Sequence, residues 1–157
     1  MDASGQAPAD GACPAAAPLV VLDTNVFVAA GFNSGSASGR IVSLAADGRL
    51  RLAWNADTRA ETRHVLRQIP RLDPTIAERL FEDGCAFESG APPAVFAVVP
   101  DPSDRKFAAL AQIAGATLIS SDSDLLSVRQ SLPVTVLTPK EWLAAHMAAI
   151  PSGQADF

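Results

Sequence analysis

Short, mostly apolar runs recur along the chain and alternate with longer segments of helical spacing. The first run, Leu19–Leu22, is apolar at every position, as expected of a strand buried on both faces of a parallel sheet. Four further segments have strand character, at residues 50–54, 94–99, 117–120 and 133–137. Together these segments predict a central sheet of four to five strands.

Segments with helical character lie between the predicted strands. They cover residues 41–45 with Gly48 as the stop, residues 55–69 with Pro70 as the stop, a helix from Pro74 through Phe81 or Phe87, residues 102–114, residues 123–126, and a last helix that starts at Pro139. This alternation predicts an α/β protein with three α/β/α layers and a mostly parallel sheet. Right-handed connections would place the carboxyl ends of the strands at one rim.

The ends of the chain differ in composition from its middle. Residues 1–17 are small and rich in proline and glycine, without periodicity, and predict a flexible leader. Residues 148–157 predict a flexible tail of similar kind. The folded unit is therefore expected at residues 18–147, a length suited to one domain with its own core.

Charge and composition narrow the class of protein. The 157 residues carry a formal net charge of −5, which argues against a long electrostatic footprint on nucleic acid but not against a nuclease with clustered acids. Cys13 and Cys85 are too few for a disulfide framework and fit a reducing compartment. Neither a secretory signal nor an apolar run long enough to cross a bilayer is visible, so we expect a cytoplasmic protein without membrane contact.

Carboxylates follow several of the predicted strands. Asp23 ends the first run, Asp101 and Asp104 follow residues 94–99, and Asp122 follows residues 117–120. In an open α/β sheet, ligands bind outside the carboxyl ends of the strands. Because ionised acids crowd together only with a counter-charge, these positions predict a divalent metal site.

Helix capping is the alternative explanation for most of these acids. Residues 58–61 match a capping box that would occupy Glu61. Asp101 followed by Pro102 is typical of an N-cap, which leaves Asp104 as the better candidate ligand and Asp101 as its support. Asp122 can cap the helix after it, and Asp124 is a ligand or a neighbour of one.

Other motifs narrow the chemistry further. The chain lacks HExxH, CxxC and close histidine pairs, and it lacks the glycine-rich loops that cradle nucleotide phosphates. Oxygen-only ligands favour Mg²⁺ or Mn²⁺ over zinc. Residues 49–71 are locally basic; they form either a solvated helix face or a strip that contacts an RNA backbone, with Arg59 and Arg63 as candidate contacts.

Four motifs in order resemble a PIN domain, and in particular the toxin components of toxin–antitoxin systems (VapC-like proteins). They are residues 20–26 (VVLDTNV), residues 60–66 (AETRHVL), residues 101–107 (DPSDRKF) and residues 120–126 (SSDSDLL), followed by Val-Leu-Thr-Pro at 136–139. The resemblance covers residues 19–145. One departure is Arg105, at a position where a small polar or acidic residue is common.

This resemblance implies an Mg²⁺- or Mn²⁺-dependent endoribonuclease that cleaves RNA with a metal-activated water, and a homodimer held inactive by a small antitoxin protein. It implies that the catalytic and metal-binding residues are Asp23, Glu61, Asp104 and Asp122, with Asp124 nearby. It also implies that Thr24 or Asn25 orients Asp23 and that Ser120 supports Asp122. Arg105 would then affect substrate binding.

Two other functions would also explain part of this pattern. A PIN-like module that binds RNA or protein without turnover would use the acids as caps and the basic strip as a docking surface. A phosphatase of the haloacid dehalogenase type also places an aspartate after its first strand, but it needs a second one two residues later. Asn25 occupies that position, which disfavours the phosphatase.

Overall fold

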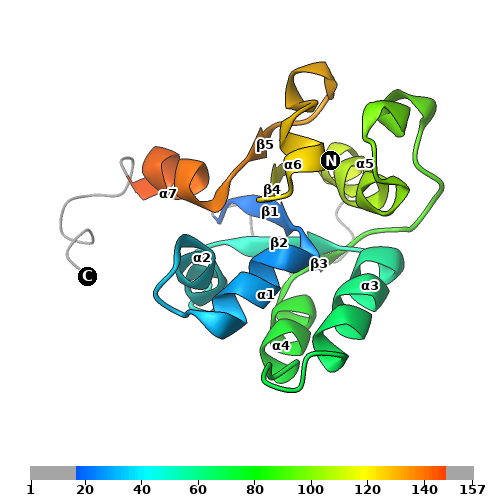
Figure 1. Ribbon diagram of the computed structural model, residues 1–157. Helices are drawn as coiled ribbons and strands as arrows, with labels where there is room; N and C mark the ends of the chain where they lie inside the picture. The colour runs from blue at the N-terminus through cyan, green and yellow to red at the C-terminus, as the bar shows by residue number, and fades with distance from the viewer. Residues whose placement is uncertain (1–16, 148–157) are drawn as a thin grey trace, which may run out of the picture.

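Five short parallel strands form the centre of the computed structural model, which describes residues 17–147 (Figure 1). The strands are β1 (Leu19–Leu22), β2 (Arg51–Trp54), β3 (Cys85–Ala86), β4 (Thr117–Ile119) and β5 (Val136–Leu137). They lie in the order β3-β2-β1-β4-β5, and every pairing is parallel. The predicted α/β class and parallel sheet are confirmed.

Helices connect the strands and cover both faces of the sheet (Figure 1). They are α1 (Thr24–Phe32), α2 (Ala37–Ala46), α3 (Ala56–Arg67), α4 (Thr75–Asp83), α5 (Arg105–Ala114), α6 (Ser123–Leu126) and α7 (Pro139–Met147), with short 3-10 helices η2 (Ala94–Val98), η3 (Pro102–Asp104) and η4 (Arg129–Ser131). Gly115 ends α5 in the left-handed conformation, with φ of 65°, which glycine adopts without steric cost.

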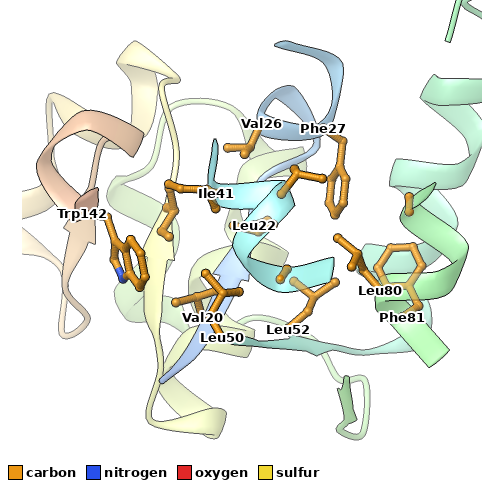
Figure 2. Packing of buried hydrophobic residues seen from close by; sticks show 14 of the residues in the cluster. Val20, Leu22, Val26, Phe27, Ile41, Leu50, Leu52, Leu80, Phe81 and Trp142 are labelled. Atoms are coloured by element: carbon orange, nitrogen blue, oxygen red, sulfur yellow. The ribbon is translucent and has the colours of Figure 1, made fainter. Parts of the chain in front are cut away.

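Two hydrophobic cores lie on opposite faces of the sheet, because side chains alternate along each strand. Val20 and Leu22 of β1 belong to the core under α1, α2, α4 and α7, shown in Figure 2. Val21 belongs to the core under α5, where it joins Phe96 and Phe107. Val20, Val21 and Leu22, three of the four residues of β1, are at most 2% exposed, which explains why none of them is polar.

The prediction of a strand at residues 94–99 is wrong: these residues form the 3-10 helix η2 and its end. Phe96 and Val99 are fully buried, whereas Val95 and Val98 are 48% and 42% exposed. A burial period of three matches the three residues per turn of a 3-10 helix. The strand next to β2 comes instead from residues 85–86, within the stretch predicted as a possible end of the helix after Pro74.

One helix was not predicted from the sequence. Helix α1 begins directly after Asp23, in a segment to which the apolar pattern assigned no element.

Cys85 is disulfide-bonded, which the cysteine count did not predict, and Cys13 lies outside the described residues. The predicted leader, apart from Ala17, and the predicted tail also lie outside the described residues. Between residues 17 and 147, no helix is long and apolar enough to span a membrane.

Gly84 joins α4 to β3 where the backbone passes close to β2. A Cβ at this position would lie 2.2 Å from the carbonyl oxygen of Leu52, so the backbone would have to shift. We expect Gly84→Ala to lower the free energy of unfolding by about 1–3 kcal/mol, measured by urea denaturation. Gly90→Ala is the control, because a Cβ there meets no atom within 4 Å. Equal stability of the two variants would contradict this account of the turn.

Candidate metal centre

Three aspartates meet at the carboxyl edge of the sheet, each at the start of a helix. Asp23 precedes α1, Asp104 precedes α5 and Asp122 precedes α6. One carboxylate oxygen from each lies within 4.8 Å of the others. Asp23 and Asp104 are only 3% and 5% exposed, and Asp122 is half-buried. Helix N-termini carry partial positive charge, which favours carboxylates at these positions.

Ser120 connects two of these acids. Its buried hydroxyl donates to Asp23 Oδ2 at 2.7 Å, and the backbone N–H of Asp122 donates to the same hydroxyl oxygen at 2.9 Å. The hydroxyl therefore fixes the end of β4 relative to the end of β1. Thr24 was predicted as a residue that could orient Asp23. Its hydroxyl instead hydrogen bonds that of Thr62 at 2.9 Å and so connects α1 to α3. Asn25 is exposed.

Burial disfavours the ionised forms of Asp23 and Asp104. Burial is the main cause of the raised pKa of Asp23, and the Ser120 hydroxyl and the backbone N–H of Asn25 act in the opposite direction. Burial and the neighbouring Asp122 carboxyl raise the pKa of Asp104 to about 8. Within residues 17–147, no donor satisfies the buried Oδ2 of Asp104 by standard hydrogen-bond geometry.

This donor set suits a hard divalent cation. All three candidate ligands offer carboxylate oxygens, and ions such as Mg²⁺ and Mn²⁺ prefer oxygen ligands. A bound cation would give the unsatisfied Asp104 oxygen a partner and would offset the repulsion among the three carboxylates. The residues therefore fit the metal that the sequence predicts.

Glu61 lies on α3 and contacts Lys106 of α5, with 2.5 Å between Oε1 and Nζ. The interpretation of Glu61 as part of a capping box is wrong, because Asn55 and Thr58 form the capping box of α3. Among the described residues, Glu61 is not in a group of acids whose oxygens all lie within 4.8 Å. The sequence analysis did not identify Lys106 as a partner of Glu61. The signal in the sequence was its position two residues after Asp104, a candidate metal ligand.

Asp101 and Asp124 lie beside the three aspartates. Asp101 is exposed and accepts hydrogen bonds from the backbone N–H and hydroxyl of Ser103, at 3.0 and 2.9 Å, so it caps η3. The backbone N–H of Asp124 donates to Asp122 Oδ1 at 2.8 Å. Asp101, Asp104 and Asp124 also have oxygens within 4.8 Å of one another, so acidic groups extend past the buried site toward solvent.

The three arginines predicted to contact substrate all have partners within the protein. Arg63 forms two hydrogen bonds with Glu78 of α4, at 2.6 and 2.8 Å. Arg105 donates to the carbonyl oxygens of residues 99 and 97, at 3.0 and 3.2 Å, and so holds η2 against α5. Arg59 lies over the ring of Trp54, 5.2 Å from its centroid.

Comparison with known proteins identifies the family. The model of the PIN domain family matches residues 19–123, more than half of the chain. The chain belongs to the PIN domain family. This confirms the resemblance recognised in the sequence motifs.

Solved structures share the PIN domain fold at low sequence identity. VapBC2 from Rickettsia felis, bound to a DNA fragment from its promoter, is 13% identical over 76% of this chain and 98% of that one, with a TM-score of 0.54. PAE2754 from Pyrobaculum aerophilum is 17% identical over 87% and 98%, with a TM-score of 0.56. FitAB bound to an IR36 DNA fragment is 18% identical over 76% and 94%, with a TM-score of 0.53. A search of curated proteins gave no match.

The acidic site should make the metal-free PIN domain less stable as pH rises. The pKa of Asp104 is about 8 in the fold against 3.8 in the unfolded chain, so between these values the fold holds a proton that the unfolded chain releases. The free energy of unfolding therefore falls as pH increases through this window. At pH 8 in EDTA, Asp104→Asn should raise this free energy by about 1–2 kcal/mol and remove stabilisation by Mn²⁺.

Thermal unfolding between pH 5 and pH 8, with and without Mn²⁺, measures both effects. Asp47→Asn is the matched control, since Asp47 is exposed at the end of α2. It should keep the pH dependence and the metal response of the wild type. An Asp104→Asn variant that is as strongly stabilised by Mn²⁺ as the wild type would refute the role of Asp104 as a ligand.

Proposed function

We propose that this PIN domain is an Mg²⁺- or Mn²⁺-dependent endoribonuclease. The observation that carries the proposal is the meeting of Asp23, Asp104 and Asp122, two of them buried, together with a buried Asp104 oxygen that has no hydrogen-bond partner among the described residues. Two buried acids and a half-buried one without cationic partners are unfavourable as purely structural features, because burial costs desolvation that capping does not recover. Membership of the PIN domain family supports a nuclease-type function for this site.

Each residue of the site would have a distinct part in the reaction. Asp23, Asp104 and Asp122 would hold the metal, and Ser120 would keep Asp23 and Asp122 in register. The metal would supply positive charge at the scissile phosphate and lower the pKa of the attacking water. In-line attack by water would leave a 5′-phosphate and a 3′-hydroxyl, and no protein nucleophile is required. Glu61, predicted as a fourth acid, adds negative charge near Asp23.

We further propose that the protein is the toxin of a toxin–antitoxin pair that acts on cytoplasmic RNA. The support is the shared fold with VapBC2 and FitAB, each of which was solved as a complex bound to DNA. A small antitoxin protein would hold the nuclease inactive, and the nuclease would act as a homodimer. The pair would then be expected to bind DNA as those complexes do.

Cleavage of RNA in vitro tests the enzymatic proposal. With Mn²⁺ or Mg²⁺, the purified protein should cut a labelled single-stranded RNA into fragments with 5′-phosphate ends, and EDTA should stop the reaction. Asp23→Asn should lower the rate at least about a hundredfold, because it removes a charged metal ligand. Asp47→Asn should retain activity. RNA binding without cleavage under every metal condition would favour the non-catalytic module instead.

Growth on induction tests the toxin proposal. Expression of the wild type should arrest growth and create new RNA 5′ ends, whereas Asp23→Asn at the same protein level should do neither. Growth rate and sequencing of RNA 5′ ends measure the two effects. Equal growth with unchanged RNA ends would rule out a toxin, even if the purified protein cleaves RNA.

A further inference from the structure

Asp104 reaches the acidic site by a different route from the other two aspartates. Asp23 and Asp122 follow the strands β1 and β4, whereas residues 87–103, which lead to Asp104, contain no strand and no α-helix. The Asp104 side chain makes no capping hydrogen bond at the start of α5, and its buried Oδ2 has no hydrogen-bond partner among the described residues. The position of this carboxylate therefore depends on the backbone that carries it.

Arg105, the next residue, connects that backbone to η2. Its Nε donates to the carbonyl oxygen of Val99 at 3.0 Å, and its Nη2 donates to that of Ala97 at 3.2 Å. Both carbonyls lie at the carboxyl end of η2, where a helix leaves acceptors without partners inside it. Phe96 and Val99 fix η2 in turn, because both side chains are fully buried in the core under α5. The start of α5 is thereby anchored directly after Asp104.

We propose that Arg105 is a positioning residue, which sets the affinity of the acidic site for its divalent cation by holding Asp104 in place. This role depends on the proposed function only in requiring that Asp104 binds the metal. The expectation from the sequence was that Arg105 affects substrate binding, but two nitrogens of its guanidinium are engaged with carbonyl oxygens of the protein itself. Removal of a group that orients a metal ligand typically lowers metal affinity about 10–100-fold.

The charge of Arg105 and its hydrogen bonds have opposite effects on cation binding. A positive charge near the site repels Mn²⁺, so loss of the charge alone would tighten Mn²⁺ binding. Loss of the two hydrogen bonds would release the start of α5 from η2 and weaken binding, because Asp104 would have to be ordered when the cation binds. The sign of the change in Mn²⁺ affinity therefore separates positioning from a simple effect of charge.

Calorimetric titration with Mn²⁺ tests the proposal without any measurement of cleavage. Arg105→Met, which keeps a long side chain and removes the guanidinium, should bind Mn²⁺ about tenfold more weakly than the wild type. Arg105→Lys keeps the charge but lacks the two-pronged geometry, so its affinity should lie between those of Arg105→Met and the wild type. Unchanged or tighter Mn²⁺ binding in Arg105→Met would overturn the proposal.

A matched variant separates this role from a general loss of stability. Arg51 also donates to a backbone carbonyl oxygen, that of Asp83, but it is the first residue of β2 and pairs with Leu19 at the amino edge of the sheet, opposite the aspartates. Arg51→Met should be destabilised in urea without metal, yet it should keep the Mn²⁺ affinity of the wild type. An equal loss of affinity in Arg51→Met and Arg105→Met would overturn the proposal.

Arg105→Lys decides the question if Arg105→Met does not fold, which circular dichroism would show. Weaker Mn²⁺ binding by Arg105→Lys than by the wild type would support the proposal, since the charge is unchanged. Equal binding by these two proteins would overturn it.

The outcomes also distinguish the role of Arg105 from the proposed nuclease. Weaker Mn²⁺ binding by Arg105→Met, in a protein whose wild type never cleaves RNA, would contradict the nuclease and support the role of Arg105. RNA cleavage by the wild type, with equal Mn²⁺ affinity in the wild type and Arg105→Met, would support the nuclease and overturn the role of Arg105. A wild type that binds no Mn²⁺ would overturn both.

Discussion

The burial of negative charge at the carboxyl edge of the sheet is the constraint on which the rest of this structure depends. Asp23 follows a strand that is covered on both faces, and Asp104 is almost as deeply buried. Each acid is favoured by a helix N-terminus but desolvated by the surrounding protein, and desolvation is the larger effect on both pKa values. The fold therefore holds an arrangement that opposes its own stability unless a cation binds.

The two apolar cores offset the unfavourable burial of these carboxylates in so short a chain. The site brings together residues far apart in sequence, such as Ser120 and Asp23, which are 97 positions apart. Only a rigid sheet can hold such groups at hydrogen-bonding distance, and β1 is rigid because β2 and β4 flank it and a core covers each face. The unfavourable burial of charge at the edge of the sheet is thus offset by packing at its centre.

The sequence contained enough to predict the parallel sheet and the positions of Asp23 and Asp122 at its carboxyl edge, because both follow from local patterns. Asp104 was expected at this edge because it follows residues 94–99, which do not form a strand. A continuous apolar run followed by an acid indicates a buried strand and its end. The same patterns failed at residues 94–99, where burial of Phe96 and Val99 follows a period of three that a short apolar run does not reveal. They also failed for Glu61, which the pattern assigned to a capping box that Asn55 and Thr58 form instead. The contact of Glu61 with Lys106 joins two helices, and no local pattern encodes it.

The arginines show how such contacts between elements change a functional interpretation. Residues 49–71 are basic in sequence, yet Arg63 is paired with Glu78, Arg51 donates to the carbonyl oxygen of Asp83, and Arg59 lies on Trp54. Their charges help to fasten α3, α4 and the sheet together. A substrate phosphate would then meet an acidic site on a chain with a net charge of −5. For the proposed ribonuclease, attraction between such a site and RNA would come chiefly from the bound cation, so metal binding and substrate binding would be linked equilibria.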